Sequence, residues 1–183
     1  MSAIQFIIHA LLSLALFVVL ARLLLQWSRA DFHNPMCEAV VRLTNPLILP
    51  MRRVLPPIRK IDTATVVAVI LIAFLGTAID LALLGVPFPP GMHLWVRSAI
   101  LAIEGMLVIT YLIAIFLYAL LSLIDPIGDS PLKEVLATVC VPVLRPFRRL
   151  IPSVAGLDLS PLWAGIAIKA LDILFGELLV KLL

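Results

Sequence analysis

Four ionisable residues lie within strongly apolar stretches of the sequence, where they could take part in chemistry: Asp80, Glu104, Lys169 and Asp172. An ionisable group at the centre of a bilayer costs about 2.5–3.5 kcal/mol on insertion scales, so such residues are candidates for a function. Lys169 and Asp172 are three residues apart, a spacing that places both on one helix face. Together with Glu104 they could line an ion or proton pathway. They could also form an ionic cluster that fixes helix packing or holds a partner, and we prefer this interpretation because no proline interrupts the first three apolar stretches, whereas transporters often have discontinuous spans.

A second set of distinctive residues occurs twice, at an offset of 96 positions that relates Arg52 to Arg148. The shared string is P-x3-P-x-R-R-x-[LI]-P-x5-D, and a repeat of this kind indicates tandem structural units. The first copy comprises Pro46, Pro50, Arg52, Arg53, Pro56 and Asp62, and the second comprises Pro142, Pro146, Arg148, Arg149, Pro152 and Asp158. Anionic lipid attracts a basic residue beside the bilayer with roughly 1 kcal/mol. The four arginines are therefore the predicted sites of docking to lipid head groups or to a partner protein.

The sequence contains none of the common catalytic motifs, such as a P-loop, GxGxxG, HExxH or GxSxG. Cys37 and Cys140 form neither a CxxC pair nor a ligand cluster, and the three histidines are scattered. We therefore expect no catalytic residue, no metal and no cofactor. We also expect no nucleic-acid partner, because the basic residues lie between apolar runs and lack interleaved stacking aromatics.

Membrane-spanning helices are the elements that must position these residues. The chain has 183 residues, of which 63% are hydrophobic, whereas soluble domains are roughly 45–50% apolar. A span needs roughly 20 apolar residues, and we predict spans at 3–25, 63–84, 98–123 and 161–183. The fourth is the least apolar, because it carries four charged residues, and it could instead lie flat at the membrane interface. The predicted fold is an all-α membrane protein with about four transmembrane helices.

Each basic loop between spans contains the pattern of an amphipathic helix. Asn34-Pro35 and Ser130-Pro131 are typical helix starts, in which a capping side chain precedes a proline. Apolar residues then recur at helical spacing and predict a helix that lies in the interface plane. In the first copy these residues are Met36, Val40, Leu43 and Leu47, and in the second they are Leu132, Val135, Leu136, Val139 and Val143. Pro50 and Pro146 are expected to end the helices, because proline lacks a backbone donor.

The order of span, basic loop and span occurs twice, which predicts two parallel repeats, 1–88 and 89–183. Short loops rich in Lys and Arg stay in the cytoplasm. The two basic loops are therefore predicted to be cytoplasmic, and both termini to lie on the other side of the membrane.

The doubled motif resembles that of the YggT family, and the resemblance covers nearly the whole chain. The first copy departs from the second at Arg59-Lys60, which replace Ala155-Gly156. The two copies therefore need not have the same function. The resemblance implies a small bacterial inner-membrane protein related to proteins of plastid thylakoids. Plastid relatives are linked to cytochrome b6f maturation and membrane organisation, and bacterial relatives to osmotic adaptation, potassium uptake and division-site organisation. No established enzymatic activity comes with the family.

These observations predict a non-enzymatic inner-membrane protein that organises the membrane or assists assembly of a membrane complex through its basic cytoplasmic loops. Its expected partners are anionic lipid head groups, together with a membrane protein or a second copy of the chain. The alternative function is a channel or transporter-linked protein in osmotic or potassium homeostasis.

Overall fold

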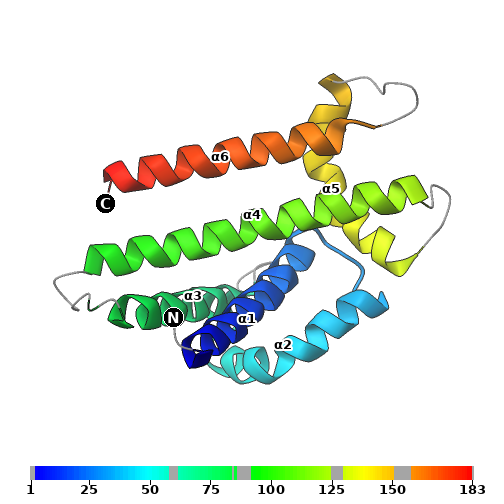
Figure 1. The fold of residues 1–183 in the computed structure, drawn as a ribbon. Helices are drawn as coiled ribbons and strands as arrows, with labels where there is room; N and C mark the ends of the chain where they lie inside the picture. Colours follow the sequence, from blue (N-terminus) through cyan, green and yellow to red (C-terminus); the bar gives the residue numbers. More distant parts are fainter. Residues whose placement is uncertain are drawn as a thin grey trace.

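The computed structural model describes residues 3–57, 62–83, 85, 92–124, 130–150 and 158–182. Over these residues the chain forms helices and no strand, which confirms the predicted all-α class (Figure 1). The helices are α1 (Ala3–Trp27), α2 (Pro35–Val54), α3 (Thr63–Leu83), α4 (Met92–Ile124), α5 (Pro131–Leu150) and α6 (Ser160–Leu182). Arg59, Lys60 and Pro152, which belong to the predicted basic loops, lie outside the described residues.

Within the described residues, three helices are long and apolar enough to cross a membrane, namely α1, α3 and α4. The prediction of four such helices is therefore corrected to three. The helix at the fourth predicted span, α6, forms as expected, but its charged residues are too numerous for it to qualify by composition. These residues are Lys169, Asp172, Glu177 and Lys181.

The long helices expose their apolar side chains rather than burying them. Ile4, Leu11 and Phe116 are each more than 60% exposed, and similar residues continue along the outer faces of α3 and α6. A water-soluble protein rarely exposes apolar surface on this scale. In a bilayer the same surface would contact lipid tails, so the fold is that of a membrane protein.

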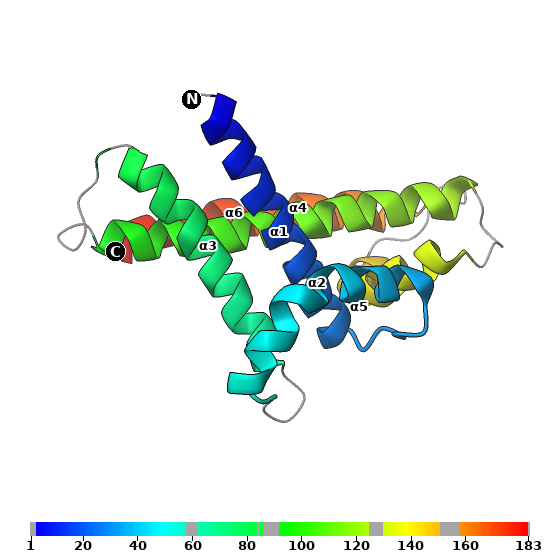
Figure 2. The same ribbon diagram turned by 90° about the horizontal axis from the view of Figure 1, so that it is seen from below.

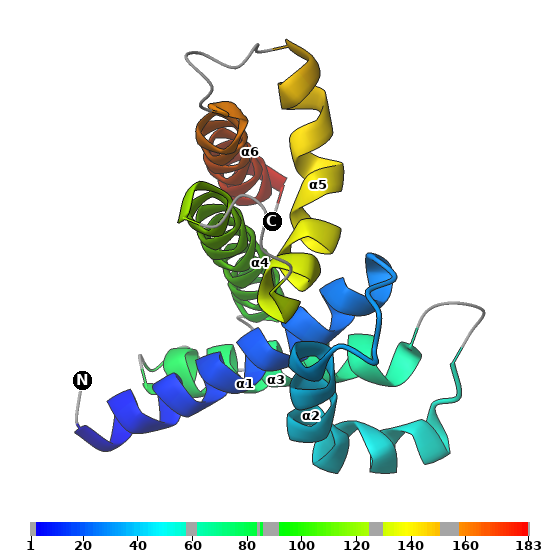
Figure 3. The ribbon, with the colours of Figure 1, turned by 90° about the vertical axis from the view of Figure 1, so that its right-hand side faces the viewer.

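The helices form two triplets that follow the sequence repeat. In the first, α1 packs against α3 and both contact α2; in the second, α4 packs against α6 and both contact α5. The triplets join where α3 and α1 pack on α4. The helices α2 and α5 meet near their starts, where Asn34 contacts Pro131 and Glu134, and then run apart (Figures 2 and 3).

Two core positions related by the 96-residue offset are buried alike in the two triplets. Ile48 and Leu144 are both 0% exposed, while Ala68 and Ala164 are 1% and 0% exposed. A long aliphatic side chain on the amphipathic helix thus fills the core of each triplet, and a small residue on the following helix permits close approach.

The helices α2 and α5 begin where the sequence predicts. The Asn34 side chain accepts a hydrogen bond of 3.0 Å from the Met36 amide, and Ser130 Oγ accepts one of 3.2 Å from the Lys133 amide. These bonds satisfy amide donors that have no partner within a helix. Pro35 and Pro131 follow at the first helical position, where the missing backbone N–H of proline costs nothing because an amide there has no acceptor within the helix.

The prediction that Pro50 and Pro146 end these helices is wrong. The helix α2 continues to Val54 and α5 continues to Leu150, with Pro46, Pro50, Pro142 and Pro146 inside them. Each proline removes one backbone hydrogen bond and bends a helix that its neighbouring turns still hold together. Both helices are accordingly bent rather than straight (Figures 1 and 2).

The predicted apolar stripe of α2 faces outward. Leu43 is 71% exposed and Met36 and Leu47 are each 42% exposed, whereas Thr44 and Ile48 are buried against the other helices. The core therefore uses the adjacent side of α2, and the larger aliphatic side chains remain on its outer surface. In α5 the predicted residues Leu136 and Val139 are buried.

Candidate functional site

An ion pair joins the end of α2 to the start of α3 in the first repeat. Arg52, in the last turn of α2, donates from Nε to both carboxylate oxygens of Asp62, at 3.3 and 3.2 Å, and from Nη2 to Asp62 Oδ2. A two-pronged contact of this kind fixes orientation as well as adding attraction. The Asp62 side chain is only 7% exposed.

The Asp62 carboxylate also accepts hydrogen bonds from two other helices. Thr65 Oγ1 in α3 donates to it at 2.7 Å, and Gln26 Nε2 in α1 donates at 3.3 Å. Burial acts to raise the pKa of Asp62, but the hydrogen bonds from Arg52, Thr65 and Gln26 outweigh it and lower that pKa to about 2. The carboxylate therefore stays ionised at any physiological pH and ties three helices together.

A buried arginine of α1 completes the first site. Arg22 is 2% exposed, and its Nη1 donates to Thr44 Oγ1 at 2.6 Å and to Asn45 Oδ1 at 3.1 Å. Arg22 was not among the residues predicted to have a role. A cation within an apolar run is nevertheless a signal of function or of a specific polar partner. The structure gives it a positioning role, because it fixes α1 against the middle of α2.

The second repeat contains the equivalent ion pair in a more open setting. Arg148 Nε donates to Asp158 Oδ2 at 2.9 Å, and Asp158 also accepts from the Ser160 amide at 2.9 Å and from the Ser160 hydroxyl. Partial burial acts to raise the pKa of Asp158, but the hydrogen bonds from Ser160 and Arg148 lower it overall. The Asp158 side chain is 42% exposed, six times the exposure of Asp62.

Arg148 also contacts an aromatic ring, and no such contact is found for Arg52 among the described residues. The Arg148 guanidinium lies over the Tyr118 ring, 5.8 Å from its centroid, and Nη2 is 3.5 Å from the Tyr118 hydroxyl. The contact with Tyr118 and the hydrogen bond to Asp158 raise the pKa of Arg148 against the opposing effect of partial burial. A cation over an aromatic face is stabilised by the ring quadrupole.

The structure thus separates the two arginines of each predicted docking pair. Arg52 and Arg148 are bound to carboxylates of their own chain. Arg53 and Arg149 are exposed, and neither has an ion-pair partner among the described residues. Asp62 and Asp158 were predicted only as members of the repeated motif, and their pairing with the arginines was missed. The recurrence of Arg and Asp ten residues apart in both copies was the available signal.

In the first repeat a further hydrogen bond joins the linker after α2 to the start of α3. Pro56 follows the helix, and its carbonyl accepts a 2.7 Å hydrogen bond from Thr63 Oγ1 at the start of α3. This bond and the Arg52–Asp62 pair both join the end of α2 to the start of α3.

Three of the four polar residues predicted within the apolar stretches come together. Lys169 forms an ion pair with Asp172, and Asp172 and Glu104 line the same cavity. Glu104 and Asp172 line a cavity of about 550 Å³ between α4 and α6. Asp80 is elsewhere, 3.5 Å from His9 Nε2.

Comparison with known proteins finds the same two repeats in this chain. The family model described as CCB3/YggT matches residues 1–84 and 97–179. A Pseudomonas aeruginosa protein, PA0392, is 36% identical over 172 residues, which cover 92% of this chain and 86% of that protein. The YggT protein of Escherichia coli K12 is 32% identical over 164 residues, covering 88% and 83%. A Vibrio alginolyticus protein of the proC 3' region is 34% identical over 183 residues, covering 98% and 96%. No solved structure matches the chain.

Proposed function

The chain belongs to the CCB3/YggT family, and on this premise we propose that it is a non-enzymatic inner-membrane protein that organises the membrane or assists assembly of a membrane complex. In this proposal α2 and α5 present the docking surface. Its ligands are anionic lipid head groups and a protein partner, which is either another membrane protein or a second copy of the chain.

The observation that carries the proposal is the placement of Arg53 and Arg149. Each follows an arginine that is held by an aspartate, so the backbone that presents the second arginine is fixed. Both side chains are exposed, and exposed Val54 and Leu150 come directly after them. A cation beside an outward apolar side chain suits the boundary between head groups and acyl chains.

The proposed orientation places α2 and α5 on the cytoplasmic side and both termini in the periplasm. Two observations support it. The basic residues gather in the segments that contain α2 and α5. Both termini lie at the opposite ends of the long helices (Figure 2). The proposal includes passage of α6 through the bilayer, because α6 runs antiparallel along the apolar α4 (Figure 1).

The docking proposal is tested by purifying the tagged full-length protein from its native membrane in mild detergent. Bound proteins and lipids would be identified by mass spectrometry for the wild type and for the double variant Arg53→Ala/Arg149→Ala. We expect the double variant to insert normally but to lose its partner or its enrichment in anionic lipid. Arg42→Ala is the matched control, because Arg42 is also exposed on α2 but pairs with Glu38. Unchanged partners and lipids in the double variant would disprove the docking role.

A second candidate function rests on the polar cluster between α4 and α6. Glu104 and Asp172 line a cavity whose remaining lining is mostly apolar, and Lys169 forms an ion pair with Asp172. As a channel or transporter-linked protein in osmotic or potassium homeostasis, the chain would pass an ion beside these groups. Glu104→Gln and Asp172→Asn would then abolish potassium flux in liposomes while insertion persists. No flux above that of protein-free liposomes would exclude this function for the isolated protein.

A further inference from the structure

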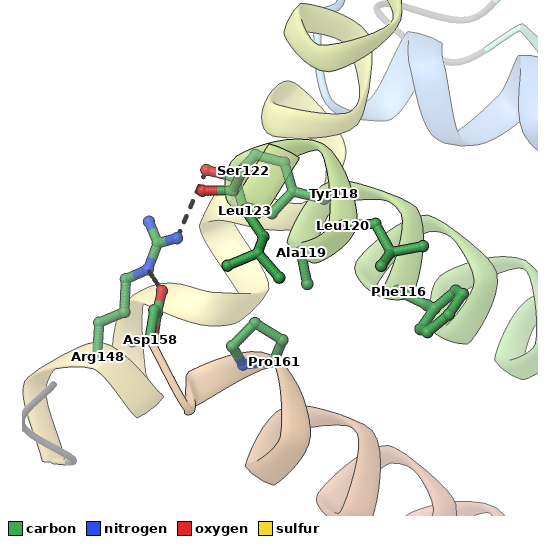
Figure 4. Close-up of a pocket in the computed structure, with 9 residues that line it drawn as sticks. All are labelled: Phe116, Tyr118, Ala119, Leu120, Ser122, Leu123, Arg148, Asp158 and Pro161. Atoms are coloured by element: carbon green, nitrogen blue, oxygen red, sulfur yellow. Dashed lines mark hydrogen bonds and ion pairs between the residues drawn. The ribbon is translucent and has the colours of Figure 1, made fainter. Parts of the chain in front are cut away.

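The second repeat contains an open pocket beside Asp158, at the position where the first repeat buries the Asp62 carboxylate. The pocket has a volume of about 250 Å³ and lies between the end of α4, the end of α5 and the start of α6 (Figure 4). Its polar lining includes Arg148, Tyr118, Ser122 and Asp158. Its apolar lining includes Phe116, Leu120 and Leu123.

The difference between the repeats follows from three substitutions at the 96-residue offset. Arg22, Gln26 and Thr65 of the first repeat correspond to Tyr118, Ser122 and Pro161 of the second. Gln26 and Thr65 reach Asp62 and seal its carboxylate from solvent. A serine is too short to replace that glutamine, and a proline offers no side-chain donor. The carboxylate of the second repeat is therefore exposed, and the space beside it is open.

The polar end of this pocket is suited to a phosphate group. Arg148 uses Nε for Asp158 and Nη2 for Tyr118, while its Nη1 has no hydrogen-bond acceptor among the described residues. Tyr118 and Ser122, which each carry a hydroxyl, line the pocket together with Arg148 (Figure 4). A guanidinium and two hydroxyls offer charge-assisted and neutral donors to phosphate oxygens. Asp158 would repel a phosphate, but its ion pair with Arg148 neutralises its charge.

The apolar end of the pocket continues onto the outer surface of α4. Phe116 and Leu123 are 62% and 65% exposed, and they lie on a helix that is apolar enough to cross a membrane. An acyl chain could lie along this surface while its head group remains at the polar end. A soluble phosphate compound would leave the same apolar side chains uncovered.

We propose that the pocket between α4, α5 and α6 binds one glycerophospholipid, with its phosphate at Arg148, Tyr118 and Ser122 and an acyl chain along Phe116, Leu120 and Leu123. The lipid occupies the second repeat alone, because Gln26 and Thr65 close the corresponding space in the first. This site refines the proposed lipid docking but does not depend on Arg53 or Arg149, which lie outside the pocket.

The site is tested by native mass spectrometry of the detergent-solubilised full-length protein titrated with phosphatidylglycerol. The wild type is expected to retain one lipid per chain. The double variant Ser122→Gln/Pro161→Thr rebuilds the closure that the first repeat already tolerates, so it should fold and bind the lipid roughly tenfold more weakly. Tyr118→Phe should weaken binding to a smaller extent, since it removes one hydroxyl and leaves the ring in place.

Two further measurements separate this inference from general attraction to a charged surface. Arg149→Ala should keep the single retained lipid even if it loses the wider lipid enrichment proposed above. Millimolar inorganic phosphate should not displace the lipid, because phosphate alone gains nothing from the apolar wall. Equal retention by the wild type and Ser122→Gln/Pro161→Thr would overturn the site. Displacement by inorganic phosphate would overturn the assignment of a lipid.

Discussion

Asp62 is the residue at which α1, α2 and α3 meet, and its ionisation should contribute to stability. Its pKa is about 2 in the folded protein against an ordinary value of 3.8. Because the folded pKa is the lower one, linkage assigns the charged form a contribution of about 2 kcal/mol. That contribution is complete above pH 4 and is lost as the pH falls from about 4 towards 2. Asp62→Asn should therefore lower the melting temperature in detergent at pH 7, and its difference from the wild type should shrink across this acid range.

Asp158→Asn is the matched control for this experiment. The Asp158 side chain is 42% exposed and forms its pair with Arg148 close to solvent. Exposed ion pairs contribute only about 0–1 kcal/mol, so the second substitution should lower the melting temperature less than the first. Equal losses at pH 7 would contradict the view that burial distinguishes the two repeats.

The two cysteine thiols should be chemically silent in the folded protein. Cys37 and Cys140 are both 0% exposed. Burial raises the pKa of each thiol, with Asp31 and Glu134 adding to the effect at Cys37, and the pKa of Cys140 reaches about 12. Since the thiolate is the reactive form, neither should react with a maleimide at pH 7.5 in mild detergent. Two thiols should react after denaturation in SDS, and rapid labelling before it would show that α2 or α5 packs differently.

At the scale of the helices, Asn34 connects the two amphipathic elements. Its Oδ1 caps α2, while its Nδ2 donates to the Pro131 carbonyl at 2.9 Å and to Glu134 Oε2 at 3.1 Å. Asn34→Asp keeps the capping oxygen but removes the donor and places a second carboxylate beside Glu134. We expect a loss of about 1–3 kcal/mol, the usual effect of removing one partner from a buried polar contact.

The substitution Glu134→Gln, combined with Asn34→Asp, tests whether these two side chains interact. In the double variant the repulsion disappears and an amide donor is restored on the opposite helix, so part of the stability should return. A double-mutant cycle of melting temperatures measures this coupling. Additive losses would mean that the contact between α2 and α5 contributes nothing.

The starts of α2 and α5 were predictable from sequence because capping is local. Asn34-Pro35 contains both the cap and the first helical residue, and no distant partner is needed. The ends were not predictable, because the effect of Pro50 depends on whether neighbouring turns remain held. Here Arg52, two residues later, is anchored on Asp62, so the helix continues beyond the proline. The outward direction of Leu43 was missed for a related reason, since α2 has apolar residues on both sides and packing chooses between them.

The two halves of the molecule repeat the same helix arrangement. The doubled motif predicted this repeat, but it did not predict the side-chain contacts within each half. The offset of 96 residues relates Arg52 to Arg148, and both form the same ion pair. The contact between Gln26 and Asp62 joins residues 36 positions apart, so no local pattern indicates it. The two repeats differ at such contacts. As a result the Asp62 carboxylate is buried, whereas the Asp158 carboxylate is exposed beside a pocket. Two similar motifs therefore need not perform the same function.

The path of α6 decides the topology of the whole molecule. It runs antiparallel along α4, which is 33 residues long and apolar enough to cross a membrane (Figure 1). The composition of α6 does not by itself indicate a span, and its proposed passage through the bilayer rests on its packing along α4. Its two central charges pair with each other as Lys169 and Asp172, which reduces the cost of burying them in the bilayer.

Single cysteine substitutions at exposed positions test this topology, because the native thiols should remain unreactive. Val54→Cys and Leu150→Cys mark the ends of α2 and α5, and Glu177→Cys marks the far part of α6. We expect an impermeant maleimide to label Glu177→Cys in intact spheroplasts and the other two only in inverted vesicles. Labelling of all three from the same side would place α6 on the cytoplasmic surface. In that case Lys169 and Asp172 would contact water, and the cavity that Glu104 and Asp172 line could not be a path through the bilayer.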